Sequence, residues 1–159
     1  MSLKPWALSH MIYLVHHGDA VGPEIDPMRP LSDRGRAAVL LVADEAARRG
    51  TKPEAIWHSG KLRARQTAEA FWKVCHPLAT LTAERGLQPM DPPSWIQDRL
   101  IGETRNVMLV GHMPHLERLY RLLIGEKEQT PSIRFPPHGM VALELEGERW
   151  KEAWQVRGP

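Results

Sequence analysis

Short apolar runs alternate with longer amphipathic stretches along the chain. Three of the runs are rich in β-branched or aromatic residues and predict buried strands: residues 11–15, 55–58 and 106–110. Two later segments alternate apolar and polar positions and predict the strands of a hairpin across Gly147: residues 140–146 and 150–156. The earlier strands are separated by enough residues for a helix, whereas the last two are adjacent.

Helical periodicity occupies the intervals between the earlier strands. The clearest helix is predicted over residues 32–49, where Ser32 is a good N-cap and Gly50 follows as a stop signal. Three further helices are expected: one over residues 61–75 with Ser59 as its cap, a short one over 95–101, and one that begins at Pro114. Alternating strands and helices predict an α/β protein, organised as a three-layer α/β/α sandwich with a mostly parallel, mixed central sheet.

The composition narrows the class of protein. A chain of 159 residues with 42% hydrophobic residues is sufficient for one core. With 21 basic and 19 acidic residues the net charge is +2, which argues against a nucleic-acid partner. No apolar run of about 18 residues is present, so no membrane partner is expected. Cys75 is alone, and the start lacks the apolar core of a secretory signal, so the expected compartment is the cytoplasm.

Polar clusters follow three of the predicted strands, at the point where each strand ends. They are His16-His17-Gly18-Asp19, His58-Ser59 and Gly111-His112. In an open α/β sheet the carboxyl ends of the strands form the ligand crevice, and helix N-termini at that edge favour an anion. Arg63 lies in the first turns of the helix after Ser59, and Arg29 lies in the loop after the first strand. These residues together indicate a phosphate site.

Several phosphate chemistries do not fit the sequence. Gly60-Lys61 resembles part of a P-loop, but Ala55 and Leu62 occupy positions where that motif needs Gly and Ser or Thr. No Arg follows Cys75 closely, as a cysteine phosphatase would require. The polar clusters contain few carboxylates, which argues against a two-metal phosphatase. Histidine itself remains as the nucleophile.

Four motifs, in the same order along the chain, resemble those of the histidine phosphatase superfamily. They are residues 14–20 (LVHHGDA), 29–32 (RPLS), 59–67 (SGKLRARQT) and 109–114 (LVGHMP). The short chain and the Arg-Pro-Leu element look most like the SixA-type phosphohistidine phosphatases. The resemblance extends from about residue 11 to residue 123. It implies a phosphoglycerate mutase-like fold, with one domain over residues 1–159, of which residues 1–9 are expected to be disordered or partly a cloning remnant.

The resemblance also implies roles for individual side chains. His17 would be the nucleophile and would carry the phosphoryl group as a phosphohistidine. Arg29 and Arg63 would hold the phosphoryl oxygens, since a guanidinium donates two parallel hydrogen bonds. His112 would donate to another oxygen as charge builds in the transition state. No metal or other cofactor would be needed.

The sequence departs from the superfamily at His16, where the family has arginine. An imidazole has fewer donors than a guanidinium and is not permanently charged. Loss of one charge-assisted contact of about 1.5–3 kcal/mol would slow turnover roughly ten- to a hundredfold. A bound phosphate would raise the pKa of His16, so we expect weakened activity or activity favoured at mildly acidic pH.

The proton donor and the substrate are less well defined. Asp19, close to the nucleophile, is a candidate acid or base, and Glu84 is a second candidate. An imidazole leaving group needs little help from an acid, which favours a phosphohistidine on a protein as the substrate. A small phosphate ester is the alternative substrate. A third hypothesis, from a different class, is a domain that binds phosphorylated ligands but is catalytically weakened by His16.

Each of these residues could also have a purely structural role. His17 and His112 could be structural histidines at strand ends, and Arg29 and Arg63 could form ordinary surface ion pairs. His112 and His115 have the spacing of a metal site, although Pro114 between them disturbs that geometry.

Overall fold

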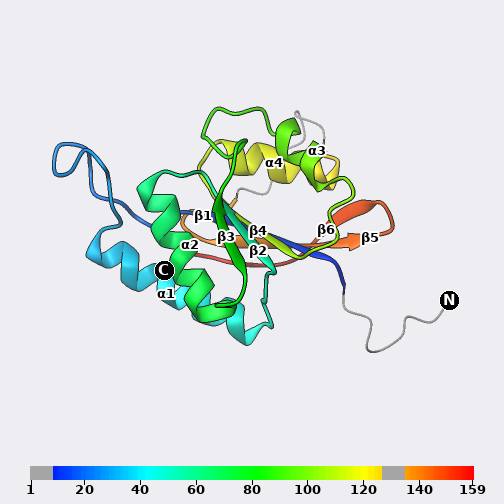
Figure 1. The fold of residues 1–159 in the computed structure, drawn as a ribbon, viewed down its shortest axis with the longest axis horizontal. Coiled ribbons are helices and arrows are strands. Elements are labelled where there is room, and N and C mark those ends of the chain that lie inside the picture. The colour runs from blue at the N-terminus through cyan, green and yellow to red at the C-terminus, as the bar shows by residue number, and fades with distance from the viewer. Residues whose placement is uncertain (1–8, 127–134) are drawn as a thin grey trace.

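A computed structural model describes residues 9–126 and 135–159, which form three layers around one sheet (Figure 1). The strands in chain order are β1 (Met11–His16), β2 (Ala55–His58), β3 (Thr80–Ala83), β4 (Val107–Gly111), β5 (Met140–Glu146) and β6 (Arg149–Val156). The helices are α1 (Asp33–Arg48), α2 (Leu62–Cys75), α3 (Ser94–Leu100) and α4 (His115–Ile124). None of the helices in these ranges is both long and apolar enough to cross a bilayer.

The sheet has the strand order β3-β2-β4-β1-β5-β6. The first four of these strands pair in parallel, and β5 and β6 join antiparallel at one side. In the parallel register His16 lies opposite Gly111, and His58 lies opposite Val110. The carboxyl ends of β1, β2 and β4 therefore share one edge of the sheet. The expected α/β/α sandwich with a mostly parallel, mixed sheet is confirmed.

Two apolar cores lie on opposite faces of the sheet. Successive side chains of a strand point to opposite faces, so β1 contributes to both. Ile12 and Leu14 pack in the core beneath α3 and α4, whereas Tyr13 and Val15 pack in the core beneath α1 and α2. Figure 1 shows α1 and α2 on one side of the sheet and α3 and α4 on the other.

The signals that predicted α1 act in the structure as expected. The Ser32 hydroxyl accepts a hydrogen bond from the Gly35 amide at 2.9 Å, which satisfies one of the free donors of the first turn. Gly50 follows the C-cap with a φ of +83°, a conformation that glycine adopts without strain. The sequence therefore fixes both ends of this helix.

The predicted role of Ser59 as the cap of α2 is wrong. The N-cap is Lys61, and its side chain makes no capping hydrogen bond. The Ser59 hydroxyl instead lies 2.6 Å from Nε2 of His112, on the neighbouring strand end. The same hydroxyl accepts a longer bond of 3.3 Å from the Lys61 amide, just ahead of the helix, so its shorter contact is with a residue 53 positions away.

Other differences from the predicted elements are small. β3 was not predicted, because it is an edge strand of only four residues, most of them exposed. The helix expected at Pro114 begins one residue later, and the hairpin across Gly147 is confirmed. The expectation of disorder for residues 1–9 concerns residues outside the described part of the chain, except for Ser9, whose hydroxyl donates to Glu144. A single domain over the whole chain stays a prediction.

Truncation of the core residue Leu119 should lower the free energy of unfolding substantially. Leu119 is fully buried on α4, and Leu119→Ala removes apolar contacts and leaves a cavity, at a cost of about 2–5 kcal/mol. Urea denaturation followed by circular dichroism measures this change. Leu78→Ala is the control, because Leu78 is 90% exposed and its truncation should change stability by less than about 0.5 kcal/mol. Equal losses in both variants would contradict the packing described here.

Candidate active site

Four histidines gather at the carboxyl ends of β1 and β4, and we refer to His16, His17, His112 and His138 as the histidine cluster. The His17 amide donates to the Gly111 carbonyl at 3.1 Å, which continues the pairing of the two strands beyond their ends. The ring centroids of His17 lie 4.6 Å from those of His16 and 5.0 Å from those of His112. The His138 ring stacks on that of His16. Residues more than 90 positions apart are thus in contact.

The proton of the neutral His17 ring can be assigned from its hydrogen bond. Nδ1 lies 2.7 Å from the carbonyl oxygen of Gly18. A carbonyl oxygen only accepts, so Nδ1 must carry the hydrogen. The lone pair of the neutral ring is therefore on Nε2, which has no hydrogen-bond partner among the described residues and is not buried. This is the form of imidazole that can act as a nucleophile.

The neighbouring ring, His16, has the opposite arrangement. Its Nδ1 accepts a hydrogen bond from the His138 backbone amide at 2.8 Å. The neutral His16 ring therefore carries its hydrogen on Nε2 and is a donor there. His138 itself donates from Nδ1 to the His17 carbonyl at 2.7 Å. His138 lies in a Pro-Pro-His-Gly turn that is outside the four motifs, and its contact with His16 was not predicted.

His112 is almost completely buried beside the cluster. Its Nε2 contacts the Ser59 hydroxyl, which also accepts a hydrogen bond from the Lys61 amide at 3.3 Å. Its Nδ1 is buried and has no hydrogen-bond partner within the described ranges. Buried polar atoms without a partner are uncommon and cost stability, so this nitrogen is a candidate for contact with a ligand.

Two arginines accompany the cluster, and no carboxylate of the described residues forms an ion pair with either. Arg63 lies in the first turn of α2, and its Nε is buried without a hydrogen-bond partner among the residues described. Burial, and then the neighbouring charge of Arg29, lower the pKa of Arg63. Arg29 has a φ of +49° and donates from Nε to the Val21 carbonyl at 3.1 Å. Neither forms an ion pair within residues 9–126 and 135–159.

The environment keeps three of these histidines, His16, His17 and His112, neutral near pH 7. Burial lowers the pKa of His17 to about 4, despite the opposing hydrogen bond to Gly18, and the charge of Arg63 adds to the decrease. Burial and the proximity of His17 lower the pKa values of His16 and His112 to about 3. The nucleophilic form of His17 is therefore present across the neutral range without a general base.

Close packing fixes the loop that carries His17. The Gly18 amide donates to the Thr67 hydroxyl at 3.0 Å, and that hydroxyl donates to the Arg63 carbonyl at 2.8 Å. A Cβ atom on Gly18 would lie 2.5 Å from Val39 on α1, so only glycine fits. A Cβ atom on Gly35 would lie 2.1 Å from the Asp19 carbonyl oxygen. These contacts tie the strand end to α1 and to the helix that carries Arg63.

Both candidate proton donors are engaged elsewhere. The Ser32 hydroxyl donates to Asp19 at 2.7 Å, and this bond, aided by Arg34 at 3.5 Å, lowers the pKa of Asp19. Glu84 accepts a hydrogen bond from Arg99 at 2.7 Å. An ionised Asp19 is poorly suited to donate a proton, so its role as acid or base stays a prediction.

The cluster does not have the arrangement of a metal site, although His16, His17 and His138 have ligand atoms within 4.8 Å of one another. The rings of His16 and His138 are nearly parallel, with an interplanar angle of 8°, so their in-plane lone pairs do not converge on one ion. The two unpaired arginines would also repel a cation. His115, the partner of His112 in the metal-like spacing, is fully buried.

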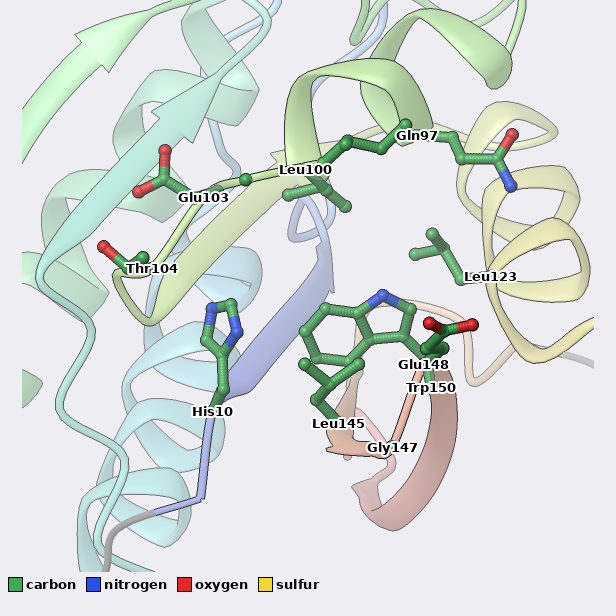
Figure 2. A pocket seen from close by; sticks show the side chains of 12 residues that line it. His10, Gln97, Leu100, Glu103, Thr104, Leu123, Leu145, Gly147, Glu148 and Trp150 are labelled. Carbon is green, nitrogen blue, oxygen red and sulfur yellow. The ribbon is translucent and has the colours of Figure 1, made fainter.

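A separate cavity of about 710 Å³ lies at the opposite edge of the sheet (Figure 2). It lies near the starts of β1 and β4 and the turn between β5 and β6, and it contains no residue of the histidine cluster. Its walls include His10, Leu100, Glu103, Leu123, Leu145 and Trp150. The polar site and this mainly apolar cavity are thus distinct features.

Comparison with known proteins identifies the class of fold to which the chain belongs. No family model and no curated protein matches the chain. Among solved structures, a protein from Agrobacterium tumefaciens named as a phosphohistidine phosphatase SixA is 26% identical, with 94% of this chain and 99% of that chain covered and a TM-score of 0.76. A protein histidine phosphatase SixA complexed with tungstate is 22% identical, with coverage of 92% and 96% and a TM-score of 0.77.

A solved structure with lower sequence identity has the same fold. A mycobacterial glucosyl-3-phosphoglycerate phosphatase is 14% identical, with coverage of 95% and 100% and a TM-score of 0.74. The chain therefore has the fold of the histidine phosphatase superfamily. Within that class it is similar to the SixA phosphohistidine phosphatases, as the four motifs predicted.

Removal of the Thr67 hydroxyl should destabilise the loop that carries His17. Thr67→Val keeps the shape of the buried side chain but leaves the Gly18 amide without an acceptor, at a cost of about 1–3 kcal/mol in unfolding free energy. Thr82→Val, at an exposed position of β3, is the matched control and should change stability by less than about 0.5 kcal/mol. If the two variants unfold at the same urea concentration, the Thr67 bond does not hold the loop.

The stability of the protein should depend on pH through the cluster. The pKa values of His16, His17 and His112 are lower in the folded state than the usual 6.5, so the unfolded chain binds more protons below that pH. Their contribution is complete above about pH 6.5. It is lost as the pH falls toward about 4 for His17 and about 3 for His16 and His112, by up to about 1.4 kcal/mol per pH unit for each histidine. Urea denaturation between pH 7 and 5 measures this slope. His112→Asn should reduce it, and an unchanged slope would contradict the assigned shifts.

Proposed function

We propose that the protein is a metal-independent phosphatase that works through a phosphohistidine on His17. The observation that carries this proposal is the pair of unneutralised arginines, Arg29 and Arg63, beside a neutral imidazole with a free Nε2 lone pair. Like charges held together without a carboxylate favour an anion between them. The buried Nδ1 of His112 and Nε of Arg63, which lack partners among the described residues, are donors that the phosphoryl oxygens would satisfy.

The reaction follows from this arrangement in two transfers. In the first, the Nε2 lone pair of His17 forms a bond to phosphorus while the bond from phosphorus to the leaving group breaks, and the leaving group takes a proton from solvent. In the second, water attacks phosphorus, the Nε2–phosphorus bond breaks, and inorganic phosphate leaves. Arg29 and Arg63 offset the charge on the phosphoryl oxygens in both steps, and His112 donates as that charge increases.

A protein phosphohistidine is the substrate that best fits a site without a free proton donor among its described residues. Neither Asp19 nor Glu84 is free to protonate a poor leaving group, whereas an imidazole is readily protonated by solvent near neutral pH. Two similar structures carry the name SixA, one as a phosphohistidine phosphatase and the other as a protein histidine phosphatase. Such a phosphoprotein would be met in the cytoplasm, the compartment expected for this chain.

The alternatives differ in substrate or in class. A small phosphate ester is supported by the likeness to a mycobacterial glucosyl-3-phosphoglycerate phosphatase. A domain that binds phosphorylated ligands without turnover is supported by His16, whose neutral ring provides less charge than the arginine of the superfamily.

The test of the proposed function is to trap the intermediate. The protein is mixed with a phosphohistidine peptide, or with a panel of small phosphate esters, and quenched within one turnover. We expect acid-labile, base-stable phosphate on His17, release of phosphate that a chelator does not reduce, and faster turnover of the peptide than of the esters. His17→Ala should lower turnover by about a thousandfold or more, because the nucleophile is removed.

The matched control is His10→Ala, which removes a histidine at the opposite edge of the sheet and should leave turnover unchanged. Faster turnover of the esters would favour the second substrate class. Binding of inorganic phosphate, with no labelled His17 from any substrate, would favour the binding domain and would overturn the proposed activity.

A further inference from the structure

We propose that His138 is a positioning residue that holds His16 as a neutral Nε2–H donor, in the place where the superfamily has arginine. The inference rests on the proposed function for its catalytic meaning, although the contacts that support it do not. It assigns a role to a residue that lies outside the four motifs. It also explains how a histidine at position 16 can contact an oxyanion without a permanent charge.

The turn that carries His138 is attached to the end of β1. The Gly139 amide donates to the Pro136 carbonyl at 3.0 Å, which closes the turn, and the His16 amide donates to the Gly139 carbonyl at 3.0 Å. His138 has a φ of +53°, in the left-handed region that directs its backbone amide toward the His16 ring. A Cβ atom on Gly139 would lie 2.2 Å from the Val156 carbonyl oxygen, so β6 holds the turn from the other side.

The His138 amide determines the tautomer of His16. A backbone amide can only donate, and it lies 2.8 Å from Nδ1, so that nitrogen must present its lone pair. The neutral ring then carries its hydrogen on Nε2, which is not fully buried and has no partner among the described residues. Protonation at Nδ1 would set two N–H groups against each other, so the same bond opposes the cationic form. This contact opposes the expectation that bound phosphate converts His16 to a cation.

The His138 ring supports the same arrangement. It stacks on the His16 ring at a centroid distance of 4.7 Å, and its own Nδ1–H donates to the His17 carbonyl. The backbone amide of His138 therefore bonds to His16, the last residue of β1, and its side chain bonds to His17, the next residue. The charged and titratable groups that face His16 are His17, His112, His138 and Arg63, and none is a carboxylate that would stabilise a positive His16.

The arrangement has a consequence for pH dependence. An imidazolium loses its charge, and with it one donor, as the pH rises past its pKa. A neutral Nε2–H donor stays available at neutral and alkaline pH. We therefore expect kcat to stay level between about pH 6 and pH 8.5, rather than to increase at mildly acidic pH.

The experiment reads the tautomer directly and separately from activity. The full chain with ¹⁵N-labelled histidine is examined by NMR between pH 5.5 and 8, with inorganic phosphate as the added anion. His138→Gly keeps the positive φ but removes the ring and its bond to His17. His138→Asn also tolerates a positive φ and offers an amide N–H in place of Nδ1–H, so it is the rescue variant. Pro137→Ala changes an exposed residue of the same turn and is the control.

We expect His16 in the native chain to keep its hydrogen on Nε2 throughout this range. In His138→Gly the backbone amide remains, but without the stacked ring and its bond to His17 the turn no longer holds that amide against Nδ1 of His16. His16 should then populate both tautomers and titrate at a higher pH. The kcat of the His138→Gly variant should fall about three- to tenfold, as expected for loss of one neutral hydrogen bond, with KM changed less than about twofold. His138→Asn should recover part of the loss, and Pro137→Ala should behave like the native chain.

Two results would overturn the inference: a native His16 protonated at Nδ1, or a His138→Gly variant with unchanged tautomer and kcat. A native chain with the expected tautomer but no turnover of any phosphorylated substrate would instead overturn the proposed function. In that case the NMR change in His138→Gly would still decide whether His138 positions His16.

Discussion

The parallel register between β1 and β4 is the constraint on which the site depends. Because His16 pairs with Gly111, the next residue of each strand end, His17 and His112, must emerge side by side at one edge of the sheet. A slip of one residue would send one of the two rings to the opposite face of the sheet. The register is itself held by burial, since both strands lie between two helical layers and all five residues of β4 are buried. Packing of the core therefore sets the distance between the two catalytic candidates.

Most of the fold could be predicted because its signals are local and strong. The bounds of β2 and β5 agree with their apolar patterns, and α1 has both a side-chain cap and a glycine stop. β3 escaped prediction because an exposed edge strand needs neither apolar alternation nor a long run. Its place in the sheet depends on pairing with β2, which is a non-local interaction.

The site was predictable in its residue types but not in its proton arrangement. The motifs indicated His16, His17, Arg29, Arg63 and His112, and the structure brings these residues to one edge of the sheet. The hydrogen on each imidazole, however, depends on backbone groups that only the folded chain places there. Nδ1 of His16 is an acceptor because the backbone amide of a residue 122 positions later donates to it, and no spacing rule predicts such a contact. The bond between Ser59 and the His112 ring is of the same kind.

The last residues of the chain lie against the turn that carries the stacked imidazole. Val156 pairs with Met140, and a side chain on Gly158 would collide with the His138 carbonyl. The residues just ahead of β1, in contrast, lie at the opposite edge of the sheet, away from the histidine cluster. A fluorophore or affinity tag fused after Pro159 would therefore begin beside the histidine cluster, whereas one attached ahead of β1 would leave that edge clear for immobilisation and labelling.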